Sequence, residues 1–228
     1  MSCIFESISR ILLPSGNKVR SPTTKLDIIR KALNVVNIAL QRRADLVVAN
    51  LPALVGVMTA AIPLLQRSRA IDGPKKASTA RVLDRFPPWI GEAEEGLGEE
   101  EARLIARLLI SLSNARISTV VNADTYDKQQ KMSRPLAKHA PAILVSYVRA
   151  ACDPFAGLSS EVRRQLEPGL FALGDVMTSG GRIDGRGREG EGIGLPFGLG
   201  EGPGGEAEKE MWAIMWRNWG RKRYTGQG

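Results

Sequence analysis

The chain has 228 residues, with 32 Lys and Arg against 24 Asp and Glu, so its formal net charge is +8. A hydrophobic fraction of 43% permits a packed core and excludes wholesale disorder. The two cysteines, Cys3 and Cys152, are too few for a disulfide framework or a four-ligand zinc site, and the single histidine, His139, excludes most histidine-based metal and relay chemistry. Composition therefore favours a binding or scaffold protein over an enzyme. We expect no catalytic residue, no cofactor and no metal.

Charge and glycine divide the chain into five parts. Residues 1–67 carry +6, residues 99–178 carry +1 and residues 206–228 carry +2. Between them, residues 68–98 are neutral, and residues 179–205 carry −1 and hold 12 of the 24 glycines. Neither intervening stretch has a sustained apolar period, which predicts a flexible insertion and a Gly-rich linker. The expected domains are a helical segment, a helical core and a C-terminal Trp-rich basic helix, in that order.

The first part predicts two helices. Ile4 and Ile8 begin an apolar face that continues to Leu12. A second helix starts at the cap and proline Ser21-Pro22, and it ends at Arg42-Arg43, whose charges favour the carboxyl end of a helix.

Residues 46–65 form a run of twenty residues without a formal charge. Its length meets the requirement for a membrane span, but Pro52, Gly56 and Pro63 would weaken a helix that faces lipid. A helix buried on all sides within a helical stack has the same pattern. We favour the buried helix and keep the span as the alternative.

Three further helices are predicted in the core. The first opens at Glu99 and the second at Pro135, the latter running through Val148. Ser159 caps the third, in which Pro168-Gly169 predicts a kink or a break into two short helices. Because strand-like alternation is absent over any useful length, the predicted fold is all-α: a helical-repeat, solenoid-like bundle with two flexible insertions.

The last predicted helix carries Trp212, Trp216 and Trp219 at helical spacing. The cluster either docks on the body or forms a surface that stacks nucleic-acid bases or binds a partner. Docking that leaves the basic end exposed is favoured. Where basic residues are most dense in the sequence, we expect an RNA-binding site whose arginines and lysine contact phosphate groups. These residues are Arg217, Arg221, Lys222 and Arg223, followed by Arg42 and Arg43.

Two other features are interpreted as structural. His139 has neither a nucleophile nor a carboxylate beside it in sequence, so its ring is expected to bond a backbone group at a helix entry. The G-x-G-x-x-G matches that begin at Gly185 and Gly200 do not follow a strand, so they predict no nucleotide site.

Several motifs stand in a distinctive order and spacing. They are Pro135 to Pro141 (Pro-Leu-Ala-Lys-His-Ala-Pro), Tyr147, Ser159 to Arg163, Pro168-Gly169-Leu170 and the basic, aromatic ending from Arg217 to Gln227. Together these motifs resemble the C-terminal domain of a nucleolar pre-ribosomal RNA processing family, the unhealthy ribosome biogenesis protein 2 family. The resemblance covers residues 132–178 most clearly and extends over 99–227.

The resemblance implies a non-catalytic nucleolar assembly factor for the large ribosomal subunit, located in the nucleus and acting in pre-rRNA processing. It implies partnership with a large helical-repeat factor, an RNA helicase and pre-rRNA. Family members are very large helical proteins, so we expect this chain to be a C-terminal domain or fragment. The alternatives are a small membrane-anchored protein with 46–65 as its span, and a generic helical adaptor without RNA.

Overall fold

Helices form nearly all the regular structure in the part of the chain that the structure describes, so the predicted all-α class is confirmed. Residues 69–97 of the predicted insertion and most of the predicted linker at 179–205 lie outside that part, as does the first glycine fingerprint. The computed structural model describes residues 2–12, 27–68, 98–117, 130–131, 133–154, 156–179, 196, 199–200 and 205–225.

The described residues of the N-terminal third form short helices that end where the sequence places charges or prolines. The second of them ends at Arg42, as predicted. In the first, Phe5 and Ile8 are buried but Ile4 is 45% exposed, so its buried face is rotated from the predicted one. The elements are α1 (Ser2–Leu12), α2 (Asp27–Arg42), α3 (Ala44–Ala49), α4 (Leu51–Ala61), the 3₁₀ helix η1 (Ile62–Leu65) and β1 (Arg67–Ser68).

The uncharged run 46–65 lies largely within the core, as favoured, although Ala49 and Pro52 are exposed and the run is not one helix. Asn50 ends α3 with non-helical backbone angles, and its side-chain amide donates to the Leu46 carbonyl at 2.8 Å. Pro52 then opens α4, and Pro63 lies in η1, because proline fits the first turn of a helix and not its interior. No described helix is long and apolar enough to cross a membrane.

The remaining elements build the C-terminal half. Two antiparallel strand pairs of two residues each, β1 with β4 and β2 with β3, were not predicted. The elements are α6 (Glu99–Asn114), β2 (Arg116–Ile117), β3 (Gln130–Lys131), α7 (Ser133–Ala137), α8 (Ala140–Cys152), β4 (Ala156–Gly157), α9 (Ser160–Ser179) and α10 (Gly205–Thr225).

The helix predicted from Pro135 to Val148 is divided at Lys138-His139 into α7 and α8, so its continuity was wrong. The ring of Pro141 would clash with the carbonyl of Ala137 in a continuous helix, and Pro141 has no N–H to donate to it. His139 is the N-cap residue of α8, but its side chain makes no capping hydrogen bond, contrary to the prediction for its ring.

Helix α9 continues through Pro168, so of the predicted kink or break the break into two helices does not occur. Ser159 Oγ accepts a hydrogen bond from the Val162 N–H at 3.2 Å and caps the helix as expected. Pro168 itself is exposed, whereas Leu166 and Leu170 on either side of it are buried. We infer that packing on both sides offsets the ~3 kcal/mol that an interior proline costs.

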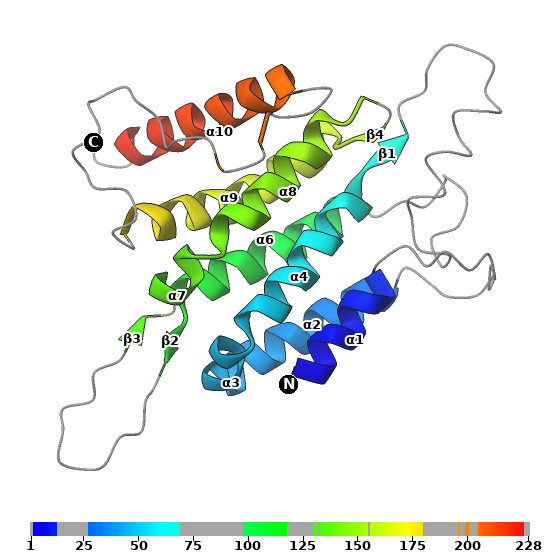
Figure 1. Ribbon diagram of the computed structural model, residues 1–228, viewed down its shortest axis with the longest axis vertical. Coiled ribbons are helices and arrows are strands. Elements are labelled where there is room, and N and C mark those ends of the chain that lie inside the picture. The colour runs from blue at the N-terminus through cyan, green and yellow to red at the C-terminus, as the bar shows by residue number, and fades with distance from the viewer. Residues whose placement is uncertain are drawn as a thin grey trace.

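Figure 1 shows the helices layered along the longest axis, from α1 and α2 at one end to α10 at the other. Helices α6 and α9 form the most extensive contact, and Gly169 permits it, because a Cβ atom there would lie 2.8 Å from Ala106 Cα. One cluster of buried hydrophobic side chains extends from Phe5 in α1 to Trp216 in α10. The layers therefore share a single core in the described residues.

Candidate functional site

Helix α10 docks on α8 and α9 through its tryptophans, as their spacing predicts (Figure 1). Trp212 and Trp216 are only 3% and 8% exposed, and Met215 beside them is also buried. Neighbouring indole rings meet edge to face, with centroids 5.5 Å apart for Trp212–Trp216 and 5.2 Å apart for Trp216–Trp219. Such edge-to-face pairs stabilise beyond their buried area. The rings of Trp212 and Trp216 thus belong to the core and do not offer a platform for base stacking.

The tryptophan cluster packs directly against Gly174 of α9. A Cβ atom at Gly174 would lie 2.9 Å from Trp219 Nε1 and 3.1 Å from Trp216 Cζ3. Trp219 Nε1 donates to Asp175 Oδ1 at 3.2 Å, next to that contact. A residue without a side chain is therefore needed where α9 meets the tryptophans.

The amino end of α10 is held by a turn from the predicted linker. Leu199 is buried, and the Gly200 N–H donates to Glu208 Oε2 at 2.9 Å. Gly200 has φ +85°, a left-handed conformation that glycine adopts readily. Cys152, at the end of α8, donates its Sγ–H to the Ala207 carbonyl at 3.3 Å.

The carboxyl end of α10 carries the four cations predicted to contact phosphate, and the structure brings them together on one helix end. Lys222 and Arg223 also help to hold the helix in place. Lys222 Nζ lies 2.7 Å from Glu167 Oε2 and 4.7 Å from the Phe171 ring centroid. Arg223 lies over the Trp219 ring, with its Cζ 5.1 Å from the centroid. Arg217 and Arg221 are also exposed.

Arg42 and Arg43 lie at the far end of the molecule from α10, at the junction of α2 and α3 (Figure 1). Arg43 makes two hydrogen bonds to Asp45, at 3.2 and 3.0 Å. This pairing raises the pKa of Arg43 and lowers the pKa of Asp45. The two groups of predicted phosphate contacts are therefore separate, and Arg43 already has an acidic partner.

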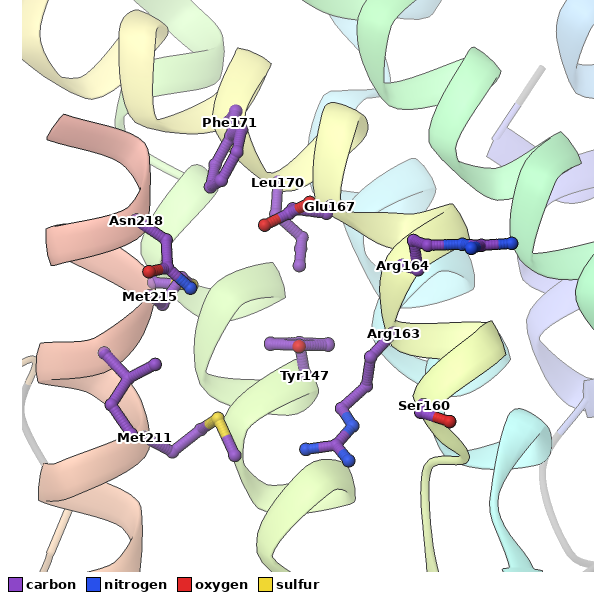
Figure 2. A pocket seen from close by; sticks show the side chains of 11 residues that line it. Tyr147, Ser160, Arg163, Arg164, Glu167, Leu170, Phe171, Met211, Met215 and Asn218 are labelled. Atoms are coloured by element: carbon purple, nitrogen blue, oxygen red, sulfur yellow. The ribbon is translucent and has the colours of Figure 1, made fainter. Parts of the chain in front are cut away.

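A pocket of about 280 Å³ opens between α9 and α10 above Tyr147 of α8. Figure 2 shows Tyr147 at its centre, with the Arg163 side chain on one side and the methionines of α10 on the other. Composition and motif reasoning did not predict this pocket, although Tyr147 and Arg163 are part of the motifs that carry the family resemblance. The lining consists of Tyr147, Ser160, Arg163, Arg164, Glu167, Leu170, Phe171, Met211, Ile214, Met215 and Asn218.

Tyr147 is the buried polar centre of the pocket. Only 6% of it is exposed, and burial raises the pKa of its hydroxyl to about 12. The positive charge of Arg163 opposes this rise in pKa, whereas the negative charge of Glu167 adds to it. The hydroxyl is therefore a neutral donor at physiological pH.

Within the described residues, no group of three or more His, Cys, Asp or Glu side chains could hold a metal ion.

Comparison with known proteins gives one family. The family model described as "Urb2/Npa2 family" matches residues 1–227. The match thus includes residues 1–98, upstream of the range 99–227 over which the motifs carry the resemblance. No curated protein and no solved structure matches the chain.

Proposed function

The chain belongs to the Urb2/Npa2 family of ribosome biogenesis factors, and we propose that it is a non-catalytic scaffold in assembly of the large ribosomal subunit. In this proposal it works in the nucleolus, where pre-rRNA is processed. Its layered helices form part of a solenoid-like surface that holds a large helical-repeat partner and an RNA helicase. The match over residues 1–227 is the observation that carries the proposal.

The carboxyl end of α10 is the proposed contact with pre-rRNA. Lys222 and Arg223 are positioned by Glu167 and Trp219, which fixes the orientation of the helix end. Arg217 and Arg221 lie exposed on the same helix. Cations fixed on a rigid helix can contact phosphate oxygens without sequence preference. Arg42 and Arg43 would form a second, separate contact at the other end of the molecule.

Binding to a fluorescently labelled single-stranded segment of large-subunit pre-rRNA, measured by anisotropy between 50 and 200 mM salt, tests this contact. We expect the double variant Arg217→Gln/Arg221→Gln to bind more weakly. Its plot of log affinity against log salt should be shallower by about 1.4, since each lost phosphate contact removes about 0.7.

The matched control is Lys31→Gln/Arg107→Gln, which removes the same charge from exposed positions on α2 and α6. Equal weakening in the control would mean that net charge, and not the α10 end, attracts RNA. Affinity of the native chain that hardly changes with salt would contradict phosphate contact altogether. Absence of RNA binding would favour an adaptor that acts through proteins alone.

A further inference from the structure

The pocket between α9 and α10 has one polar side and one apolar side. Arg163 and Tyr147 form the polar side, whereas Met211 and Met215 of α10 form an apolar wall opposite them, with Asn218 beside Met215 (Figure 2). Ile214 of α10 also lines the pocket. Ile214 is 38% exposed, so apolar surface continues from the pocket to the outside of α10. Methionine side chains adapt to differently shaped ligands and are frequent on surfaces that bind peptides.

A donor on the polar side has no partner within the described structure. Arg163 Nε is buried without a hydrogen-bond partner, and the guanidinium forms no ion pair with a described residue. The Tyr147 hydroxyl also lines the pocket, but Arg163 Nε is the one of the two donors that is buried without a partner. A buried donor without a partner costs about 1–3 kcal/mol, so an acceptor that enters here recovers a substantial free energy.

The charges of the residues that line the pocket fit a ligand with a single negative group. Glu167, the acidic residue of the lining, is neutralised by Lys222 at 2.7 Å. In Figure 2 the Arg164 side chain extends away from Tyr147, which leaves Arg163 as the cation beside it. One cation with one neutral hydroxyl donor matches one carboxylate.

The apolar side distinguishes a peptide from RNA. Base recognition requires an open aromatic face on which a base can stack. Phe171 has Lys222 over its ring, and the ring of Tyr147 is buried. Aliphatic and thioether groups instead fit a side chain such as that of leucine or isoleucine.

We propose that this pocket binds a short peptide of a partner protein, which places an apolar side chain against Met211, Ile214 and Met215 and an adjacent carboxylate against Arg163 and Tyr147. The inference deepens the proposed scaffolding function, and it rests on that function for the class of partner.

N-acetyl-leucine, which combines an apolar side chain with a carboxylate, is the probe for the test. Its affinity for the full chain is measured from the ¹³C-methyl NMR signals of the methionines. We expect saturable shifts of the Met211 and Met215 signals, while Met58 in the core stays unchanged. N-acetyl-leucinamide, which lacks the charge, should bind about tenfold more weakly, since one charge-assisted hydrogen bond is worth about 1.5 kcal/mol or more.

Two variants test the donors. Arg163→Met keeps an unbranched apolar stem and should abolish the preference for the acid over the amide. Tyr147→Phe removes only the hydroxyl, and it should weaken the acid several-fold while leaving the amide unchanged. Circular dichroism melting shows whether each variant is folded, and Tyr147→Phe keeps the test valid if Arg163→Met is not.

Three results would overturn the proposal. They are equal affinity of the native chain for acid and amide, unchanged preference in both variants, and displacement of the probe from the Met211 and Met215 signals by a ten-nucleotide uridine RNA. The last result would assign the pocket to RNA. Failure here is distinguishable from failure of the RNA-binding proposal, because neither variant alters Arg217 or Arg221.

Discussion

Arg30 of α2 pairs with both Glu100 and Glu101 of α6, and these ion pairs link the N-terminal helices to the second half of the molecule. Glu101 is the buried member of the group. Its side chain is 3% exposed, and it accepts hydrogen bonds from Arg30 Nε at 2.6 Å and from the Gly98 N–H at 2.8 Å. Burial acts to raise the pKa of this carboxyl and is the largest influence on it. The bonds from Gly98 and Arg30 together outweigh burial, so the pKa is lowered.

Removing Arg30 should therefore destabilise the protein. We expect Arg30→Met to lower the free energy of unfolding at pH 7 by about 2 kcal/mol, less than the 3–5 kcal/mol of a fully buried pair because Arg30 is 42% exposed. Urea unfolding measures the change. Lys31→Met, on the next and exposed residue, should stay within about 0.5 kcal/mol.

The same pair predicts a dependence on acid. Because the pKa of Glu101 is lower in the folded chain, its contribution to stability is present above the pKa of an unfolded glutamate and is lost as the pH falls through the folded pKa. Urea unfolding between pH 7 and pH 3 should show a smaller loss in Glu101→Gln than in the native chain. Equal losses would mean that Glu101 is not the group responsible.

At this scale the sequence predicts the helix start at Glu99 but not the burial of Glu101. A run of three glutamates is typical of an exposed first turn, where each carboxylate favours the helix dipole. The partner that makes burial tolerable, Arg30, is 71 residues away in the chain. No local pattern indicates such a pair.

At the scale of elements, the contact between α6 and α9 depends on Gly169. Alanine normally stabilises a helix interior by about 1 kcal/mol relative to glycine. Here the added Cβ would meet the Ala106 backbone at 2.8 Å, so Gly169→Ala should instead destabilise by about 1–3 kcal/mol. Thermal or urea unfolding measures either effect.

Gly220 in α10 provides the matched control, because a Cβ atom there meets nothing within 4 Å. Gly220→Ala should stabilise by about 0.5–1 kcal/mol. If both variants shifted stability in the same direction, the close approach of α6 and α9 would not be the reason for glycine at 169.

Docking of α10 makes a prediction for hydrogen exchange. Trp216 contacts both neighbouring tryptophan rings, so Trp216→Ala should loosen the helix and increase exchange over residues 205–225. Exchange in α6 and α9 should change much less. Arg217→Ala, at the adjacent exposed position, should leave protection as in the native chain.

Sequence patterns predict most helices because their apolar residues recur at helical spacing, but boundaries depend on contacts that the pattern does not contain. Pro168 predicts a kink or a break in α9, yet the helix is continuous, and Leu166 and Leu170 are buried on both sides of the proline. Pro141 falls inside the single helix predicted from Pro135 to Val148, whereas in the structure it lies in the first turn of α8, after the break that separates α7 from α8. A proline thus lies inside a continuous helix in one case and next to a helix break in the other, and the packing of its neighbours decides which occurs.

For the whole molecule, the family resemblance predicts a function, whereas charge and periodicity predict only helices and candidate contacts. Charge density identifies Arg42, Arg43 and the C-terminal cations as similar candidates, but the fold separates the two groups and pairs Arg43 with Asp45. The pocket around Tyr147 could not be predicted either, because its walls come from α8, α9 and α10, which meet only in the folded chain. Sequence reasoning therefore finds helices and candidate charges more readily than it finds the surfaces they build.

The most direct test of the central claim is sedimentation of the tagged chain in a nuclear extract, with large-subunit precursor rRNA measured across the same gradient. A role in large-subunit assembly predicts that the chain sediments with the precursor particles and moves to the light fractions after ribonuclease treatment. A chain that remains in the light fractions without ribonuclease, while the precursor particles sediment normally, would contradict it.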